Sequence, residues 1–486
     1  MKLKELYNNR KIILFYTMIT MIYFGIFAKI EYATDTYATF SFSLKEFCNI
    51  FSASGRFLTV FSGIIVRTLK LSDSLCYSLS FILAVLSMIF SQYKLYKIIK
   101  EDIECKELQI IIPVLIILNI FSIELFLFIE KGIIIFGIFM CICALENIIK
   151  LFKTNEKKYY LFSLIFILLA NFSYQGVIGI FIAISVIYII KFSKNIKDFF
   201  INNVIVGSAY VLPTLFDYIA IKMLFKNDRI NGERILIESI KKISLSTVRM
   251  IISTYNILPK FLFLGLIISV LLLIIYKILS QKNLRLVNIL KVLYIVLAII
   301  MVSILPQMLQ NTNSIWFVPR STYSYAALFG ILVLYLVIYF KPNKNIIRII
   351  LFLSVILLLF QFCSFNKIGT DRYKINEMDY EISKKINEYI NEYENKTGNH
   401  INKIAIYHDS GPQYSYDRIF TTGDTNIKAY SIDWSIVSIL KYYCQKDLEL
   451  INKDDMKQIK FNEKNWMNFD KDQLIFEKDT LHLCIY

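Results

Sequence analysis

The sequence predicts an all-α polytopic membrane protein of about eleven spans, followed by a small C-terminal α+β domain. Hydrophobic residues make up 56% of the 486 residues and charged residues only 19%, which excludes an ordinary soluble domain. Apolar runs long enough to cross roughly 30 Å of hydrocarbon recur throughout the first three quarters of the chain. From Ser364 onward, Asn, Asp, Glu, Lys and Tyr dominate. We therefore expect a membrane domain over 1–363 and an extracytoplasmic domain over 364–486.

The first apolar run, 12–28, follows basic residues and lacks a small-residue cleavage site. It is therefore interpreted as a retained span and not as a removed signal peptide. The further predicted spans are 75–93, 108–129, 133–151, 159–172, 177–190, 199–220, 258–276, 289–309, 323–340 and 346–362. The short runs 159–172 and 177–190 flank a polar step at 171–176, so they are either two spans or a re-entrant pair.

Loop charges give this arrangement an orientation. Lys and Arg concentrate on the cytoplasmic side of membrane proteins, and every predicted inner loop is rich in them. The first inner loop, for example, contains Lys94, Lys97 and Lys100. The N-terminus is then cytoplasmic, and an odd number of spans leaves the C-terminal domain outside. Residues 364–486 hold 17 Lys and Arg against 20 Asp and Glu, so the chain's net charge of +16 arises in the membrane part. We attribute this positive charge to the concentration of Lys and Arg in the inner loops and to attraction of anionic membrane lipid. We expect no nucleic-acid partner.

One predicted outer loop, 222–254, is also basic and carries apolar residues between its cations. This pattern is typical of an interfacial amphipathic helix. Such a helix either rests on headgroups or gathers a lipid-linked phosphate or an anionic acceptor polymer.

The tail predicts a small α+β unit. Its expected elements are an amphipathic helix from Ile375 to Tyr393, strands at 403–407, 474–476 and 481–483, and a helix at 432–443 capped by Ser431. A polar loop with Gly411-Pro412 and Gly423-Asp424 lies between them. Cys444 and Cys484 either form a disulfide or remain free, and the spacing of the eight cysteines implies no zinc site.

Acidic residues follow the first span in the predicted outer loop 29–74. Glu31 and Asp35 stand four residues apart, and Arg56 precedes a second apolar stretch. A carboxylate that takes the proton of an attacking hydroxyl and a cation that neutralises a departing phosphate are the parts that sugar transfer from a lipid phosphate needs. The alternative is that both acids are only the polar flank of a span.

Four elements in order resemble a known family. They are the acidic loop with Asp35, the turn Ser54-Gly55-Arg56-Phe57-Leu58, the step Asn171-Phe172-Ser173-Tyr174-Gln175, and a tail with Asp371-Arg372-Tyr373 and Ser431-Ile432-Asp433-Trp434. Together they resemble the Gtr-type polytopic glucosyltransferases, which convert serotype by O-antigen glucosylation and belong to the C-type membrane glycosyltransferase superfamily. That family often has two adjacent acids in the first loop, whereas Thr34 precedes Asp35 here.

The resemblance implies transfer of glucose or another hexose from an undecaprenyl-phosphate donor to a cell-surface glycan outside a bacterial plasma membrane. Asp35 would be the base and Glu31 would assist it. A small flippase and an enzyme that synthesises the donor are the implied functional partners. No cofactor is required, although Mg²⁺ or Mn²⁺ would suit carboxylate ligands.

Further residues are candidates for substrate contacts. We expect Arg56, Arg320 and Arg249 to bind the donor phosphate. The alternative for Arg320 is an anchor at the end of a span whose side chain extends to the membrane interface. Tyr37, Gln175 and Trp434 are the candidate sugar contacts. A polysaccharide polymerase or ligase, or a transporter of lipid-linked sugar, is the alternative function, and a transporter would need charged groups within its spans.

Overall fold

The computed structural model describes residues 9–225, 235–280, 285–308, 310–408, 420–422, 425–461 and 469–485. The chain is 77% helical, and within the described residues nine helices are long and apolar enough to cross a membrane. The coarser part of the predicted class is therefore confirmed, namely a mainly helical chain with long apolar helices that could span a membrane and a small additional sheet. The chain forms two compact units, of which unit 1 comprises 1–28, 46–126 and 130–366, and unit 2 comprises 29–45, 127–129 and 367–486.

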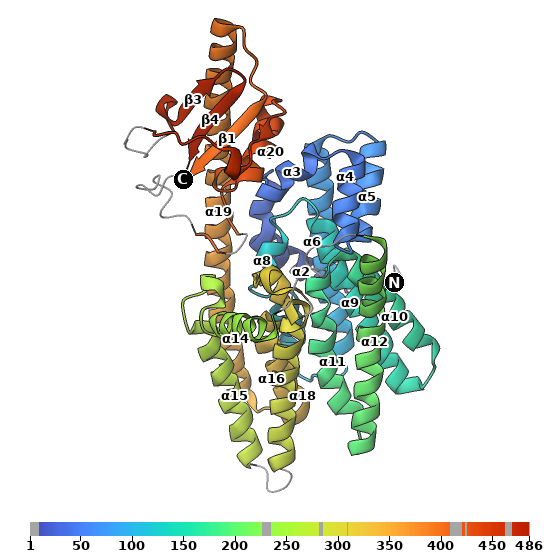
Figure 1. Ribbon diagram of the computed structural model, residues 1–486. Coiled ribbons are helices and arrows are strands. Elements are labelled where there is room, and N and C mark those ends of the chain that lie inside the picture. Colours follow the sequence, from blue (N-terminus) through green and yellow to red (C-terminus); the bar gives the residue numbers. More distant parts are fainter. Residues whose placement is uncertain are drawn as a thin grey trace. The chain divides into compact units, whose positions relative to one another are not determined.

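Unit 1 is a helical bundle (Figure 1). Its described helices are α2 (Arg10–Phe24), α5 (Phe57–Thr68), α6 (Asp73–Ile99), α7 (Lys106–Ile117), α8 (Ser122–Leu125), α9 (Lys131–Thr154), α10 (Lys158–Ser173), α11 (Gly179–Phe192), α12 (Ile196–Leu224), α14 (Leu236–Ser253), α15 (Leu262–Ser280), α16 (Arg285–Met308), α17 (Tyr323–Ala326) and α18 (Leu328–Phe340). Helix α4 (Leu44–Ala53) lies at the boundary of the two units, and α19 (Lys344–Thr397) has residues in both.

The centre of unit 1 is formed by α9, α11 and α18. The most apolar stretch of α9 is 78% buried, whereas that of α15 is 33% buried. Helix α9 packs against α6 and α10, and α11 packs against α12 and α16. Leucine and isoleucine side chains on α12, α15 and α16 remain exposed, which is the pattern of helices whose outer faces meet lipid.

Two predicted spans differ from the structure. The run 108–129 is not one helix, because α7 ends at Ile117 and only the four-residue α8 follows before α9. Pro113 lacks a backbone donor in α7, and the side chain of Asn119 accepts from the Phe121 N–H at 3.0 Å, which turns the chain. The run 159–172 becomes α10, whose 16 residues are shorter than a usual span.

Helix α14 is the described part of the predicted amphipathic loop, since 226–234 lie outside the described residues. Ser239, Ile243 and Met250 are buried against the bundle, while Ile237 and Ile240 are exposed. In Figure 1 the helix runs crosswise to α15 and α16, with which it makes contacts. An exposed apolar stripe on a basic helix of this orientation supports the interfacial interpretation.

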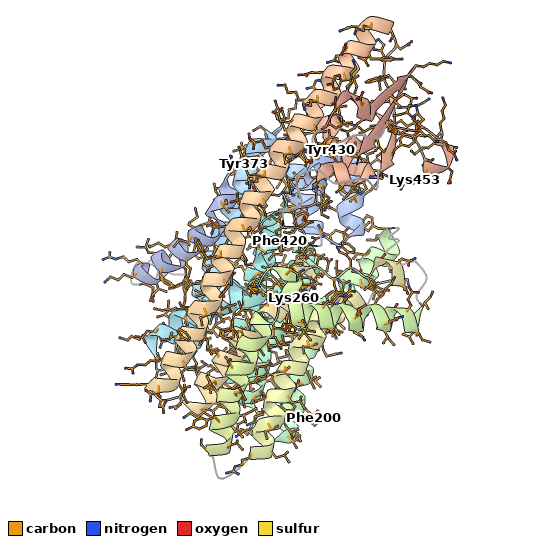
Figure 2. The ribbon with its side chains drawn as sticks, turned by 90° about the vertical axis from the view of Figure 1, so that its left-hand side faces the viewer. Phe200, Lys260, Tyr373, Phe420, Tyr430 and Lys453 are labelled. Carbon is orange, nitrogen blue, oxygen red and sulfur yellow. The ribbon has the colours of Figure 1, made fainter. Side chains whose placement is uncertain are left out.

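Unit 2 is built around a four-stranded sheet with strand order β2-β1-β4-β3. Strand β1 (Lys403–His408) is parallel to β2 (Glu449–Leu450) and β4 (Thr480–Ile485), and β3 (Leu474–Glu477) is antiparallel to β4. The remaining helices are α20 (Asp433–Cys444), α3 (Thr34–Ser41) and the polar half of α19, along which the sheet lies in Figure 1. Tyr430, which Figure 2 labels, has its hydroxyl 2.7 Å from the hydroxyl of Ser383 of α19, a hydrogen bond within unit 2.

The tail predictions have mixed outcomes. The strands at 403–407, 474–476 and 481–483 and the helix at 432–443 are confirmed. The Ser431 cap is wrong, because Ile432 occupies the N-cap and the Ser431 hydroxyl donates to the Lys428 carbonyl. Cys444 and Cys484 are not joined by a disulfide. The pairs Gly411-Pro412 and Gly423-Asp424 lie outside the described residues.

The predicted helix from Ile375 is not a separate element. It is the continuation of α19, a single helix of 54 residues whose apolar half precedes its polar half. Ile375, Ile382 and Ile386 are buried, as their helical spacing predicts. The side chains thus change from apolar to polar near Ser364 while the helix continues without a break.

A buried histidine in β4 makes the stability of unit 2 depend on pH. Burial lowers the pKa of His482 below its usual 6.5, Glu477 opposes this shift and Lys457 adds to it. The folded state then binds fewer protons than the unfolded state, so stability is lost as pH falls from about 6.5 through the lowered value. We expect hydrogen-exchange protection of β1 and β4 to weaken from pH 7 to pH 5, and His482→Gln to flatten this change. An equal pH response in the variant would contradict the assignment.

Candidate functional site

The candidate residues from the sequence are divided between the two units. Arg56, Gln175, Arg249 and Arg320 belong to unit 1, and the other four belong to unit 2. The unit 2 residues are Glu31, Asp35, Tyr37 and Trp434.

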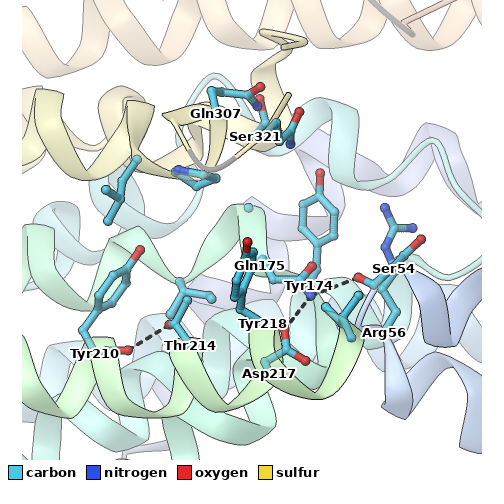
Figure 3. A pocket seen from close by; sticks show the side chains of 16 residues that line it. Ser54, Arg56, Tyr174, Gln175, Tyr210, Thr214, Asp217, Tyr218, Gln307 and Ser321 are labelled. Atoms are coloured by element: carbon cyan, nitrogen blue, oxygen red, sulfur yellow. Dashed lines mark hydrogen bonds between the residues drawn. The ribbon is translucent and has the colours of Figure 1, made fainter. Parts of the chain in front are cut away.

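Unit 1 contains a cavity of about 190 Å³ that brings two of these residues together (Figure 3). It lies between α12, the turn before α5, the 3-10 turn Gln175–Val177, the end of α16 and the 3-10 turn Pro319–Thr322. Its polar lining comprises Ser54, Arg56, Tyr174, Gln175, Tyr210, Thr214, Asp217, Tyr218, Gln307, Gln310 and Ser321. A polar-lined cavity within an apolar bundle indicates a functional site, because polar groups at such depth are costly.

Asp217 is the carboxylate of this cavity. It is 2% exposed and lies in the last third of α12, where an aspartate is unfavourable without a partner. The amide of Gln175 donates to its Oδ2 at 2.9 Å and also to the Ser54 carbonyl at 3.0 Å. Within the part of the chain that the structure describes, Oδ1 is buried and has no hydrogen-bond partner. One oxygen is thus held in place while the other is open to a donor from a ligand.

Gly55 allows the turn to approach this pair closely. Its φ is +73°, a conformation that other residues adopt with strain. A Cβ at this position would lie 2.4 Å from the Gln175 amide and 2.9 Å from the Asp217 carboxylate. The Ser54-Gly55-Arg56 motif therefore positions both the Ser54 carbonyl and the side chain of Arg56 at the cavity.

Arg56 supplies the positive charge. Its guanidinium donates to Glu130 at 3.0 Å and lies 4.9 Å from the ring centroid of Tyr174. Its Nε is buried without a hydrogen-bond partner among the described residues. Because Glu130 engages only one edge of the guanidinium, the cation keeps donor capacity for an anionic group.

The remaining lining suits a small polar ligand. Tyrosine rings from Tyr174, Tyr210 and Tyr218 lie among amides and hydroxyls, a combination that can pack on a sugar ring and bond its hydroxyls. Gln310 has a buried Oε1 without a partner in the described residues. The volume is below the roughly 300–1,000 Å³ of drug-sized sites, so the cavity matches a group of about one sugar ring.

Arg320 and Arg249 are placed differently from Arg56. Both the backbone N–H and the guanidinium of Arg320 bond the carboxylate of Glu124, the latter at 2.9 Å, and Glu124 is completely buried. Arg249 is exposed on α14. Neither belongs to the described lining of the cavity. For Arg320, this internal ion pair explains why an arginine is retained at that position.

Sequence reasoning missed the partners that make this site. Asp217, which lines the cavity, and Glu130, which pairs with Arg56, are not among the candidate residues named from the sequence. The signal available in the sequence was the isolated acid within an apolar run, which is rare unless it has a function. The pairing with Gln175 could not be derived, because the two residues are 42 positions apart.

The candidates of unit 2 lie on α3, on α20 and before α3. Asp35 is exposed in the first turn of α3, and Glu31 is 3% exposed. Tyr37 is fully buried with its hydroxyl 3.3 Å from that of Tyr443, so its ring belongs to an aromatic cluster. Trp434 is 45% exposed at the start of α20. Of these, Asp35 and Trp434 are accessible to a ligand of unit 2.

Among the described residues, no group of three or more His, Cys, Asp or Glu side chains is arranged to hold a metal ion. Comparison with models of known protein families gives no match, and comparison with curated protein sequences gives none either.

Proposed function

We propose that this chain is a membrane glycosyltransferase that transfers glucose or another hexose from an undecaprenyl-phosphate-linked sugar to a cell-surface glycan. The observation that carries the proposal is the cavity of unit 1, which is lined by both Asp217 and Arg56. Gln175 bonds one oxygen of the Asp217 carboxylate, and Glu130 bonds one nitrogen of the Arg56 guanidinium. A base and a phosphate-binding cation are what the reaction needs.

The reaction is a single displacement at the anomeric carbon. The carboxylate takes the proton of the acceptor hydroxyl while the hydroxyl oxygen forms a bond to the anomeric carbon. The bond from that carbon to the phosphate oxygen breaks, and the lipid phosphate leaves with the electron pair. Arg56 stabilises the negative charge that develops on the leaving phosphate. The Gln175 amide positions Asp217 by bonding its other oxygen.

Two carboxylates compete for the role of base. Asp35 is the candidate from the sequence, and its side chain is exposed on α3. Asp217 is the candidate from the geometry, because it lines the cavity together with the cation. We favour Asp217, with Arg56 as the phosphate partner and Gln175 as the positioning residue.

The bacterial plasma membrane and an outward-facing unit 2 belong to this proposal. They rest on the loop charges and on the resemblance of the sequence motifs. The functional partners, a small flippase and a donor-synthesising enzyme, follow from the same reasoning.

The experiment is a transfer assay in proteoliposomes that contain the full chain. Radiolabelled undecaprenyl-phosphate glucose and an isolated surface glycan are supplied, and incorporated label is measured. We expect label in the glycan only when the protein is present, with inversion at the anomeric carbon by NMR, because one base permits direct in-line displacement. Absence of incorporation with hexose donors, or retention of configuration, would contradict the proposal.

A transporter of lipid-linked sugar is the second candidate. Its supporting observation is that Asp217 and Glu124 are buried carboxylates within the helical bundle, which a transport route would require. The same proteoliposomes distinguish the two, since a transporter moves labelled lipid to the other leaflet and forms no new glycosidic bond.

A further inference from the structure

Unit 2 contains a cavity of its own, with a volume of about 420 Å³. It lies on one face of the sheet, where Ala405 of β1 is in register with His482 of β4. Thr480 is two residues from His482 on the same strand and belongs to the same face. The chain that follows β2 contributes Ile451 and Met456 to the lining. The volume falls within the roughly 300–1,000 Å³ of small-molecule sites.

His482 directs a hydrogen-bond acceptor toward this cavity. It is 3% exposed, and its Nδ1 lies 3.0 Å from the hydroxyl of Tyr407. That hydroxyl donates its one hydrogen to the Lys457 carbonyl at 3.0 Å. Because burial keeps the pKa of His482 below its usual value, the ring is neutral at pH 7 and donates to Tyr407 from Nδ1. Nε2 is then an acceptor, and among the described residues it has no hydrogen-bond partner.

A second acceptor faces this nitrogen. Oε2 of Glu477, at the end of β3, lies 3.8 Å from Nε2 of His482, which is too far for a hydrogen bond. Glu477 also pairs with Lys457. Its side chain is 42% exposed and can therefore turn to admit a ligand. Two neighbouring acceptors call for two donors on the ligand, which adjacent hydroxyls of a sugar ring provide.

The charges around the cavity are nearly balanced. The lining holds three carboxylates and two ammonium groups, and Lys403, outside the lining, pairs with Asp479 at 3.3 Å. The five charged residues of the lining are Asp455, Lys457, Glu477, Lys478 and Asp479. This balance favours an uncharged ligand over a polyanion or a polycation. The side chains of Ala405, Ile451 and Met456 add an apolar surface on which the C–H groups of a sugar ring can pack.

We propose that this cavity binds a neutral saccharide, with two adjacent hydroxyls donating to Nε2 of His482 and to the carboxylate of Glu477. The ammonium group of Lys478 donates to a further hydroxyl oxygen. A phosphate would meet the imidazole lone pair and the carboxylate, both of which repel it. The inference concerns unit 2 alone and does not depend on the proposed glycosyltransferase activity.

The test is NMR spectroscopy of the full chain in nanodiscs of dioleoylphosphatidylcholine, which avoid detergents with sugar headgroups. The chain has three histidines, so ¹³C at their Cε1 atoms gives three signals, and His482→Gln identifies the signal of His482. Maltose, cellobiose and lactose are titrated separately. We expect at least one of them to shift the His482 signal saturably, because Cε1 is bonded to Nε2. The signal of His400 should not move.

Glu477→Ala removes the second acceptor and should weaken saccharide binding by at least tenfold, the usual loss for a hydrogen bond to a charged group. Glu449→Ala is the matched control, because Glu449 is exposed on β2 of the same sheet and outside the described lining. It should bind as the wild type does. Hydrogen exchange of β1 verifies that both variants are folded.

Three results would overturn the inference. The first is that none of the three disaccharides shifts the His482 signal. The second is wild-type affinity in Glu477→Ala. The third is a saturable shift of the same signal at lower concentrations of potassium phosphate or of ethanolamine, which would identify a site for an anion or for an amine.

Discussion

Asp217→Asn is expected to lower sugar transfer by about 10²- to 10⁴-fold, the usual contribution of a positioned general base. Asparagine has nearly the same shape and can still accept from the Gln175 amide, whose bond to Oδ2 is 2.9 Å long. The variant therefore loses the basic oxygen without opening a gap. The measurement is the initial rate of label incorporation in proteoliposomes with matched protein content.

Two variants make this result interpretable. Asp198→Asn is the matched control, because Asp198 lies in the first turn of the same helix and outside the described lining of the cavity. It should transfer sugar at the wild-type rate. Asp35→Asn tests the other carboxylate. Full activity of Asp217→Asn together with loss of activity in Asp35→Asn would reject Asp217 as the base and return that role to α3.

Arg372→Met is expected to destabilise unit 2 by on the order of 1–3 kcal/mol, the cost of leaving a buried acceptor without its donor. Arg372 lies in the polar half of α19 and is 2% exposed. Its guanidinium donates to the carbonyl of Tyr32 and to that of Ile427 at 3.4 Å. Methionine fills a similar volume but leaves both carbonyls without this donor.

The measurement is hydrogen exchange of the full chain, followed in peptides from 29–45 and 425–461. We expect protection to fall in both segments of the variant while that of α9 and α11 is unchanged. Arg348→Met, an exposed arginine in the same helix, is the control and should leave exchange as in the wild type. Unaltered protection in Arg372→Met would show that the guanidinium does not hold these segments together.

Helices and strands with a clear hydrophobic pattern could be predicted from the sequence, whereas turns that interrupt an apolar run could not. The strand at 403–407 was predictable because Ile404, Ala405 and Ile406 form a short continuous apolar run between polar segments. The run 108–129 misled because mean hydropathy does not distinguish one helix from α7, a turn and α8. The turn depends on the side-chain bonds of Asn119, which composition does not encode.

The continuity of α19 was missed for a related reason. A fall in hydropathy near Ser364 predicts a change of solvent, and a helix can pass from one solvent to another without ending. No proline interrupts the segment, and its single interior glycine, Gly369, does not end the helix.

The candidate site was only partly predictable. Arg56 and Gln175 could be named because local motifs carried them. Asp217 could not be assigned to them, because the approach of Gly55 to Gln175 and Asp217 joins three distant parts of the chain. Arg320 was predicted as a phosphate contact, and its engagement by Glu124 depends on a pairing 196 positions apart.

Two of the helices that meet at the first cavity are short, and this affects the surrounding bilayer. Helix α5 begins directly after Arg56 and has 12 residues, and α10 ends just before Tyr174 and has 16. At 1.5 Å per residue they extend about 18 Å and about 24 Å, less than the roughly 30 Å thickness of hydrocarbon. In a bilayer that both helices enter, local thinning of the lipids beside them would match this short length. For the proposed transferase, such thinning would shorten the path by which the phosphate of an isoprenoid lipid donor leaves the headgroup layer and reaches the guanidinium.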